Sequence, residues 1–180
     1  MNIYYFTPYS LEKNLGAAYN EYMRLLPHDD DYACFVDADA MFLTPDFGHQ
    51  LTEIVKRYPD AGMFTAITNR VGNRRQCYKF KISKDPNIIN HKSIAELEKK
   101  RAPYKVSVVD YPISGHLMMM QKKVWKHFPF SEDLKILGVD NEISKRLMKA
   151  GYKIYLMKGV YIFHYYRMKE GGQQFKKHLL

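Results

Sequence analysis

The stretch Tyr32-Ala-Cys-Phe-Val-Asp37-Ala-Asp39-Ala-Met-Phe-Leu43 places two carboxylates, one residue apart, between two apolar runs. The run before Asp37 follows an acidic turn and is rich in aromatic and branched residues, which predicts a short buried strand. Two carboxylates at the end of such a strand repel each other unless a cation lies between them. Mg²⁺ and Mn²⁺ prefer oxygen ligands of this kind. The stretch therefore predicts either a divalent-metal site at Asp37 and Asp39 or a solvated acidic turn.

Strand and helix patterns alternate on both sides of this stretch, which predicts an α/β fold with a mixed, mostly parallel sheet flanked by helices. We expect strands at 2–6, 32–36, 61–67, 105–110, 115–121, 152–157 and 160–164. Four helices are expected. The first has Asn14 as its N-cap and ends before Pro27, and the second has Thr44 as its N-cap and Pro45 as its first residue. The third is a short helix around Val124, and the fourth follows Glu142 and is ended by Gly151. One further short helix is indicated by the capping box Ser93-x-x-Glu96.

The length and composition of the chain are those of one globular domain. Its 180 residues, 46% of them apolar, can bury a sizeable core, so we expect a single domain over 1–180 with a peripheral tail at 166–180. No stretch reaches the ~18 apolar residues of a membrane span, and the N-terminus lacks a signal-peptide pattern. We therefore expect a cytoplasmic protein. Cys34 and Cys77 lack metal-type spacing and are expected to be free thiols.

Positive charge is concentrated in segment 68–105, which holds eleven Lys or Arg against three acidic residues, within a chain of formal net charge +9. We expect this segment to be a long basic insertion or acceptor-side loop. Such a patch would attract phosphates, anionic saccharides, an anionic membrane surface or nucleic acid. Peripheral membrane contact through basic segments is therefore one expectation. Nucleic-acid binding is an alternative, because Tyr78, Phe80 and Tyr104 offer stacking surfaces, but no nucleic-acid-binding signature is present and no such partner is expected.

Three later residues have chemistry that complements the aspartate pair. Asp140 and Glu142 are either catalytic carboxylates or first-turn acids favoured by a helix dipole. His164 follows an apolar strand and is either a packing residue or a metal ligand. Together with Asp37 and Asp39 they fit one mechanism. A divalent ion holds a diphosphate, the imidazole is a further ligand, and a separate carboxylate takes a proton from an incoming hydroxyl.

Five blocks, in order, resemble glycosyltransferase family 2, whose members have the GT-A fold. The blocks are Asn14-Leu-Gly16-Ala-Ala-Tyr-Asn20, similar to an N-x-G-x-x-x-A-x-N helix start; the strand 32–39 ending in D-x-D; the glycine-containing strand and aromatic helix 113–125; 137–152, similar to G-E-D-x-D-L-x-x-R-x-x-x-A-G-Y; and the strand 160–164 ending in His. The chain resembles a small, N-terminally shortened member, and the blocks cover most of it outside 68–105. The resemblance implies one Rossmann-like GT-A domain.

The resemblance also implies an activity. It is the metal-dependent, hexosyltransferase-type transfer of one sugar from a UDP- or GDP-sugar to a saccharide or other hydroxyl acceptor, with Mn²⁺ or Mg²⁺ as cofactor. Asp37, Asp39 and His164 are implied at the metal, and Asp140 as the base of an inverting displacement, unless Glu142 shares that role. Residues expected near the nucleotide are Thr7, Pro8, Tyr9, Asn14, Gly16, Asn20 and Asp37. A retaining enzyme of the same fold lacks support, because no H-x-x-G-x-K-P-W-type ending follows His164. A member that binds a nucleotide sugar without turnover remains an alternative.

Overall fold

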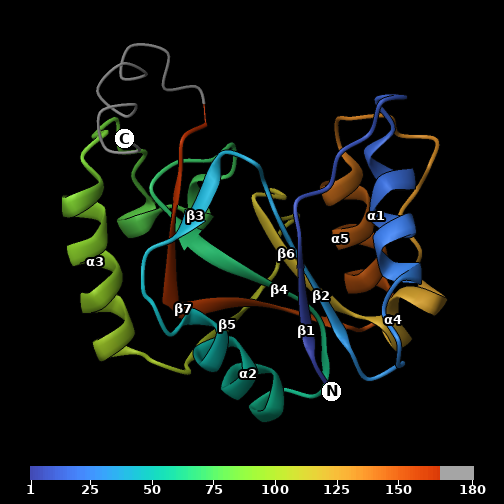
Figure 1. Ribbon diagram of the computed structural model, residues 1–180, viewed down its shortest axis with the longest axis horizontal. Coiled ribbons are helices and arrows are strands. Elements are labelled where there is room, and N and C mark those ends of the chain that lie inside the picture. The colour runs from blue at the N-terminus through green and yellow to red at the C-terminus, as the bar shows by residue number, and fades with distance from the viewer. Residues whose placement is uncertain (167–180) are drawn as a thin grey trace.

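The computed structural model describes residues 1–166, which form a seven-stranded mixed sheet with helices on both faces (Figure 1). In chain order the elements are β1 (Ile3–Phe6), α1 (Leu15–Arg24), β2 (Tyr32–Val36), β3 (Ala40–Phe42), α2 (Phe47–Arg57), β4 (Ala61–Thr68), the 3₁₀ turns η1 (Arg74–Gln76) and η2 (Tyr78–Phe80), α3 (Ile88–Arg101), β5 (Val106–Val109), β6 (Leu117–Gln121), α4 (Lys122–His127), α5 (Val139–Lys149) and β7 (Lys153–His164). The predicted tail lies, apart from Tyr166, outside the described residues.

The strands follow the order β1-β2-β6-β4-β7-β3, and β5 pairs with the first half of β7. β1 and β2 pair in parallel, as do β4 and β7, whereas β6 runs antiparallel to β2 and β4. β3 and β5 run antiparallel to β7. Four of the seven strands therefore share one direction, and the prediction of a mixed, mostly parallel α/β sheet flanked by helices is confirmed.

The strand directions decide where a site can form. The strands β1, β2, β4 and β7 all end at one edge of the sheet, and β6 begins there, since Val36 pairs with Leu117. Segments that follow Phe6, Val36, Thr68 and His164 therefore meet the segment that precedes Leu117. Ligand sites in open α/β sheets occur outside this edge.

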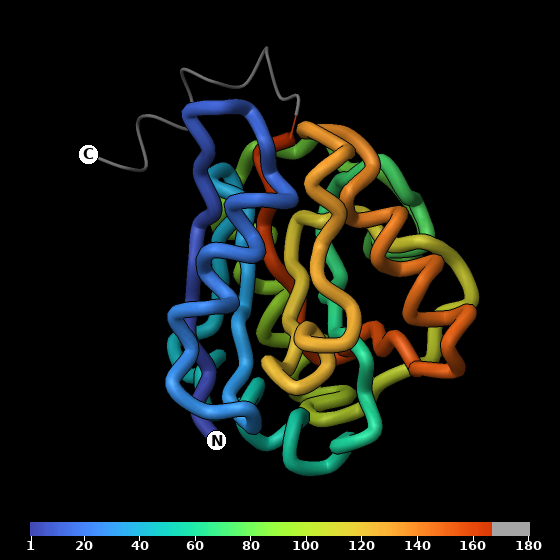
Figure 2. The backbone as a smooth tube through the Cα atoms, turned by 90° about the vertical axis from the view of Figure 1, so that its right-hand side faces the viewer, coloured from blue at the N-terminus to red at the C-terminus, as the bar shows by residue number. Residues whose placement is uncertain are grey.

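Each face of the sheet has its own core. One core contains buried side chains of α1, α3, α4 and α5, including Tyr19, Ala95, Val124 and Ile143. The other contains Leu51, Ile54 and Val55 of α2. Alternate strand residues serve the two cores, as the two-residue period of a strand requires. Figure 2 shows α1 beside the segment that leads from α4 to α5 on the first of these faces.

Three helix starts differ from the prediction. α5 begins at Val139, with Gly138 as N-cap, and not after Glu142, so Asp140 and Glu142 lie in its first turn. α2 begins at Phe47 with Asp46 as N-cap, so Thr44 and Pro45 lie ahead of the helix. α3 is a helix of 14 residues that begins at Ile88, because the Asn87 side chain accepts the N–H of Ile89. The predicted capping box is therefore wrong. Ser93 lies inside α3, where its hydroxyl donates to the carbonyl of Ile89.

Two strand predictions also change. β7 is one strand of 12 residues, where two strands were predicted. Ala66 of β4 pairs with Met157 and the next residue, Ile67, pairs with Tyr161, so the three residues between Met157 and Tyr161 form a bulge within one continuous strand. β3 is a three-residue strand that no pattern indicated. Within residues 1–166 none of the helices has the length and apolar character that crossing a membrane requires. Cys34 and Cys77 are buried free thiols.

Gly16 is required by the close approach of α1 to the segment before α5. A Cβ there would lie 1.9 Å from the carbonyl oxygen of Ser131, which is backbone and cannot rotate away. We expect Gly16→Ala to lower the free energy of unfolding by about 1–3 kcal/mol or more, the range of an overpacked site. Urea denaturation monitored by circular dichroism measures the change.

Gly48 provides the matched control, since it occupies the equivalent position in the first turn of α2. A Cβ there meets nothing nearer than the Tyr5 hydroxyl at 3.6 Å. Gly48→Ala should leave stability unchanged or raise it by up to about 1 kcal/mol through helix propensity. Equal effects of the two substitutions would contradict the packing explanation.

Candidate functional site

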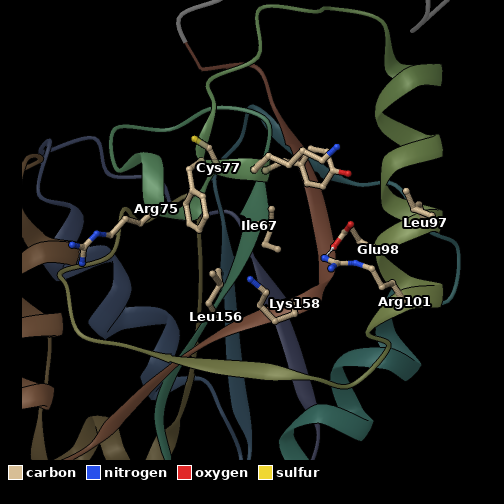
Figure 3. Close-up of a pocket in the computed structure, with 11 residues that line it drawn as sticks. Ile67, Arg75, Cys77, Leu97, Glu98, Arg101, Leu156 and Lys158 are labelled. Carbon is tan, nitrogen blue, oxygen red and sulfur yellow. Dashed lines mark hydrogen bonds and ion pairs between the residues drawn. The ribbon is translucent and has the colours of Figure 1, made fainter.

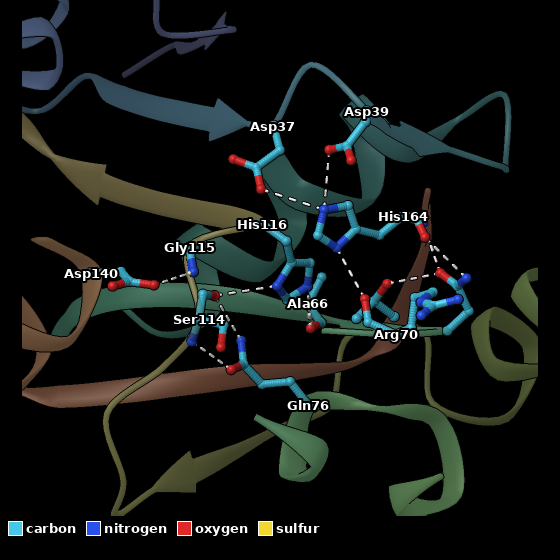
Figure 4. Close-up of polar contacts among 12 residues, drawn as sticks. Asp37, Asp39, Ala66, Arg70, Gln76, Ser114, Gly115, His116, Asp140 and His164 are labelled. Atoms are coloured by element: carbon cyan, nitrogen blue, oxygen red, sulfur yellow. Dashed lines mark hydrogen bonds and ion pairs between the residues drawn. The ribbon is translucent and has the colours of Figure 1, made fainter. Parts of the chain in front are cut away.

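Asp37, Asp39 and His164 come together where β2 and β7 end (Figure 4). His164 Nε2 lies 3.1 Å from Asp39 Oδ1 and 3.5 Å from Asp37 Oδ2. The strand β3 produces this arrangement, because Ala40 pairs with His164 and the Tyr165 N–H donates to the Asp39 carbonyl at 2.8 Å. The turn that carries the aspartates is thus folded back against the end of β7. The three residues predicted as metal ligands form one cluster.

The hydrogen bonds of His164 orient its imidazole. The ring is buried, with 2% of the residue exposed, and its Nδ1 lies 3.0 Å from the carbonyl oxygen of Arg70. A carbonyl oxygen only accepts, so Nδ1 carries the proton and, in the neutral ring, the Nε2 lone pair faces the carboxylates. A lone pair facing two carboxylates is unfavourable unless a proton or a metal ion lies between them. The cluster can therefore hold either a proton on Nε2 or a metal ion.

Asn69 holds the backbone of His164 in place. Its Oδ1 accepts the His164 N–H at 2.7 Å, and its Nδ2 donates to the His164 carbonyl at 3.1 Å. Asn69 follows β4 directly and is 1% exposed. The side-chain amide of Asn69 therefore takes the place of one more pair of backbone hydrogen bonds between β4 and β7. It fixes the backbone position of His164 and thereby the position of the imidazole.

The two aspartates differ in their electrostatic surroundings. Burial raises the pKa of Asp37 to about 6, an effect that His164 opposes and the charges of Asp39 and Asp140 reinforce. The hydrogen bond that His164 donates when Nε2 is protonated lowers the pKa of Asp39, against the smaller opposing effect of burial. A divalent ion between them would favour the ionised form of both carboxylates.

A cavity of about 370 Å³ adjoins the cluster. Its lining includes Asp37 and His164 from the cluster, together with Gly115, His116, Leu137 and Asp140. Its size lies within the range of small-ligand sites in proteins. The structure thus places the predicted residues Asp37, Asp140 and His164 around one cavity.

Asp140 lies in the first turn of α5, where a carboxylate is favoured by the helix dipole. Its Oδ2 accepts the N–H of Gly115 at 2.8 Å, and its Oδ1 accepts the N–H of Asn141 at 2.8 Å. A Cβ at Gly115 would lie 3.2 Å from the Asp140 Cβ, so glycine permits this close approach. The carboxylate is thereby held in a defined orientation at the wall of the cavity.

Glu142 does not reach this cavity. Its two carboxylate oxygens pair with Arg146, at 2.5 Å from Nε and 3.0 Å from Nη2. The same guanidinium also donates to the carbonyl of Pro129. The prediction that Glu142 shares the acidic role therefore finds no geometric support, and its observed role is to pair with Arg146 within α5.

Three residues predicted near the nucleotide instead attach α1 to the segment before α5. Asn14 caps the helix through Ala17 N–H and donates to the Glu132 carbonyl. Gly16 permits the close approach described above. Asn20 uses both amide hydrogens, on Phe130 O and Glu132 Oε1, and its oxygen accepts from Trp125 Nε1 and Phe130 N. Asn20 therefore has no hydrogen-bonding capacity left for a ligand.

Thr7, Pro8 and Tyr9 follow β1 at the same edge of the sheet as the cluster. They are not among the residues that line the cavity, and Tyr9 is 72% exposed. The topology brings them to the edge of the sheet where the cluster lies, but they do not line this cavity.

His116 is a buried neighbour of the site that sequence reasoning did not single out. Its ring stacks on that of His164, with centroids 5.7 Å apart, and its nitrogens face the carbonyls of Ser114 and Ala66. Burial lowers the pKa of His116 to about 3. The only sequence signal was the polar run Ser114-Gly115-His116 ahead of an apolar strand.

The basic segment 68–105 is ordered and forms part of the packed structure. It contains the end of β4, the turns η1 and η2, and α3, which packs on β7. Several of its cations are in ion pairs: Arg75 with Asp110, Lys99 with Asp46, and Arg101 with Glu98. Part of the excess positive charge is therefore balanced locally.

No known protein-family model matches this chain, and no curated protein matches it either.

We expect Asn69→Ala to destabilise the protein by about 2–3 kcal/mol, because it leaves the buried N–H and C=O of His164 without their partners. Asn90→Ala is the control, since Asn90 makes an exposed side-chain hydrogen bond to Asp85. It should change stability by about 0.5 kcal/mol or less. Urea denaturation of both variants tests the role of Asn69, and equal changes would refute it.

Proposed function

We propose that this protein is a GT-A-fold, metal-dependent glycosyltransferase. It transfers one sugar from a UDP- or GDP-sugar to a hydroxyl acceptor, with inversion at the sugar carbon. The observation that carries the proposal is the position of His164 Nε2, which faces two carboxylates beside a cavity that also presents Asp140. The order of sequence blocks that resemble glycosyltransferase family 2 supports the same function.

The donor atoms of the cluster fit a divalent ion. Ligands bound at about 2.1 Å in octahedral positions lie about 3 Å apart when adjacent. The observed separations of 3.1 Å and 3.5 Å from His164 Nε2 to the carboxylate oxygens are close to this value. The Nδ1–H bond to the Arg70 carbonyl is the kind of outer contact that fixes a histidine ligand. Carboxylate ligands suit both Mn²⁺ and Mg²⁺, and the imidazole ligand suits a transition-metal ion better than Mg²⁺, so Mn²⁺ is the ion that we propose.

In the proposed reaction Asp37, Asp39 and His164 hold the ion, and Asp140 acts on the acceptor. The ion, when bound, neutralises charge that develops on the diphosphate leaving group. The protein's own contribution is to hold the two carboxylates and the imidazole in place and to present a third carboxylate, that of Asp140, at the wall of the adjoining cavity.

Asp140 has the attributes of a general base. It lines the cavity and has a fixed orientation, through the N–H groups of Gly115 and Asn141. It takes the proton of the acceptor hydroxyl as that oxygen bonds to the sugar carbon. The bond from this carbon to the diphosphate oxygen breaks, and its electron pair leaves with the diphosphate.

The donor half of the proposal predicts metal-dependent nucleotide binding. Mn²⁺ together with UDP or GDP should raise the melting temperature more than either component alone, because the ion is bound by both protein and diphosphate. Asp39→Ala should abolish the increase, since it removes one of three ligands. Differential scanning fluorimetry with a matrix of metals and nucleotides measures this.

Asp46→Ala is the control for Asp39→Ala, because Asp46 is a half-exposed aspartate that pairs with Lys99 at 2.5 Å, outside the cluster. It should retain the ligand-induced increase. The donor half of the proposal fails if no nucleoside diphosphate stabilises the protein in the presence of Mn²⁺.

The acceptor half predicts that Asp140→Asn retains nucleotide binding but loses turnover by roughly 10²–10⁴-fold, the usual contribution of a general base. The asparagine can still accept the Gly115 N–H but cannot take a proton. Release of UDP or GDP from nucleotide sugars, with and without saccharide acceptors, measures turnover. If the wild-type protein binds nucleotide sugars but releases no UDP or GDP from them, it binds its ligand without catalysis.

Asp133→Asn is the control for Asp140→Asn, because Asp133 is exposed in the segment before α5. It should leave turnover unchanged. Glu142→Gln should also retain activity to within a few-fold, since Glu142 pairs with Arg146 outside the cavity. Unchanged turnover in Asp140→Asn would refute its role as base.

A further inference from the structure

A second cavity, of about 360 Å³, lies on the face of the sheet that α1, α3, α4 and α5 cover (Figure 3). It is bordered by η2, α3 and the strands β4 and β7. None of its lining residues belongs to the cavity beside the aspartate pair. The segment 71–78 separates the two, because Val71 and Gly72 line the first cavity whereas Cys77 and Tyr78 line the second. The second cavity therefore needs its own explanation.

The charged groups at this cavity are mainly cationic. Lys79, Arg101 and Lys158 line it, together with one carboxylate, that of Glu98. Glu98 is 2% exposed and ion-paired with Arg101, so its charge is already balanced. Lys158 lies in the strand β7 and, within residues 1–166, forms no ion pair. The remaining charge of the lining is therefore positive.

Arg75 also lines the cavity, but its guanidinium has other partners. It pairs with Asp110 at 3.1 Å and lies 5.0 Å from the centre of the Tyr111 ring. Figure 3 shows this guanidinium pointing away from Lys158 and Arg101. The positive charge of the lining that no carboxylate balances therefore comes from Lys158 and Lys79.

Apolar side chains complete the lining. Ile67 and Leu156 are buried, whereas Leu97 and Phe80 are 55% and 68% exposed. Small-molecule sites in proteins are mostly apolar with a few polar groups that fix orientation. This combination of apolar surface and net positive charge suits a ligand with an apolar body and an anionic group.

The backbone at the rim is strained. Lys79 and Phe80 are consecutive residues with φ of +51° and +59°, in the left-handed region that side chains with a Cβ rarely adopt. Such strain is concentrated at ligand-binding and functional positions, where the surrounding structure compensates for it. Here the strained turn brings one cation and one aromatic ring to the same cavity.

We propose that this cavity binds a small organic anion. Its phosphate or carboxylate group contacts Lys158, Arg101 and Lys79, and its apolar or aromatic body packs on Ile67, Leu156 and Phe80. The site is independent of the proposed transferase function, because it shares no lining residue with the first cavity.

Methyl-detected NMR with phenyl phosphate as probe, in the presence of EDTA, tests the proposal on the intact chain. The methyl signals of Ile67 and Leu156 should shift during titration, while those of Ile136 and Leu137 in the first cavity should not. Benzyl alcohol and inorganic phosphate should each bind at least roughly tenfold more weakly, since each lacks one of the two recognised features. Benzoate in place of phenyl phosphate distinguishes the two anionic groups, and tighter binding of either than of benzyl alcohol supports the proposal.

Lys158→Met should weaken phenyl phosphate binding by roughly tenfold, the value of one charged contact. Lys92→Met is the control, because Lys92 is exposed on α3 and does not line the cavity. Lys79→Met replaces Lys158→Met if the latter does not fold. The proposal is overturned if Ile67 and Leu156 do not respond at millimolar phenyl phosphate, if the shifts centre on Leu137, or if Lys92→Met weakens binding equally.

Discussion

The candidate site depends on two hydrogen bonds between the side chain of Asn69 and the backbone of His164. β4 and β7 are parallel neighbours, and each would otherwise leave its last peptide groups unpaired at the edge of the sheet. Asn69 satisfies those of His164, and the next carbonyl, that of Arg70, accepts from the imidazole. Consecutive residues after β4 thus fix both the position and the orientation of the ring that faces Asp37 and Asp39.

Sequence patterns were sufficient to predict most of the helices and strands. They also predicted that Asp37 and His164 lie at the same edge of the sheet. Asp37 and His164 each follow an apolar strand, and parallel strands end together, so their proximity followed from topology. The start of α3 was missed because a capping-box pattern at Ser93 competes with the actual cap at Asn87. The three residues of β3 are too few for a periodic pattern, although their pairing with β7 completes the cluster.

Residue type alone could not separate ligand-facing groups from groups that hold the structure together. Asn20 and Glu142 have the right chemistry for a site, but their partners are Phe130, Glu132 and Trp125 in one case and Arg146 in the other. The contacts of Asn20 span more than a hundred residues of sequence, and no local pattern encodes them. Asp140 is distinguished from Glu142 only by the approach of Gly115, which depends on how β6 meets α5.

The segment 71–78 separates the acidic side chains of the first cavity from the basic side chains of the second. Gln76 is fully buried and bonds to Thr65 Oγ1 and to the backbone of Ser114, so the segment 71–78 is fixed to β4 and to the approach of β6. Both cavities are therefore formed before any ligand binds, which lowers the cost of binding. The first presents the carboxylates of Asp37 and Asp140, and a diphosphate is repelled from it until a cation is bound. The second attracts anions without a metal. In the proposed transferase a bound divalent ion, rather than the shape of either cavity, would decide whether a phosphate-bearing ligand enters the first one.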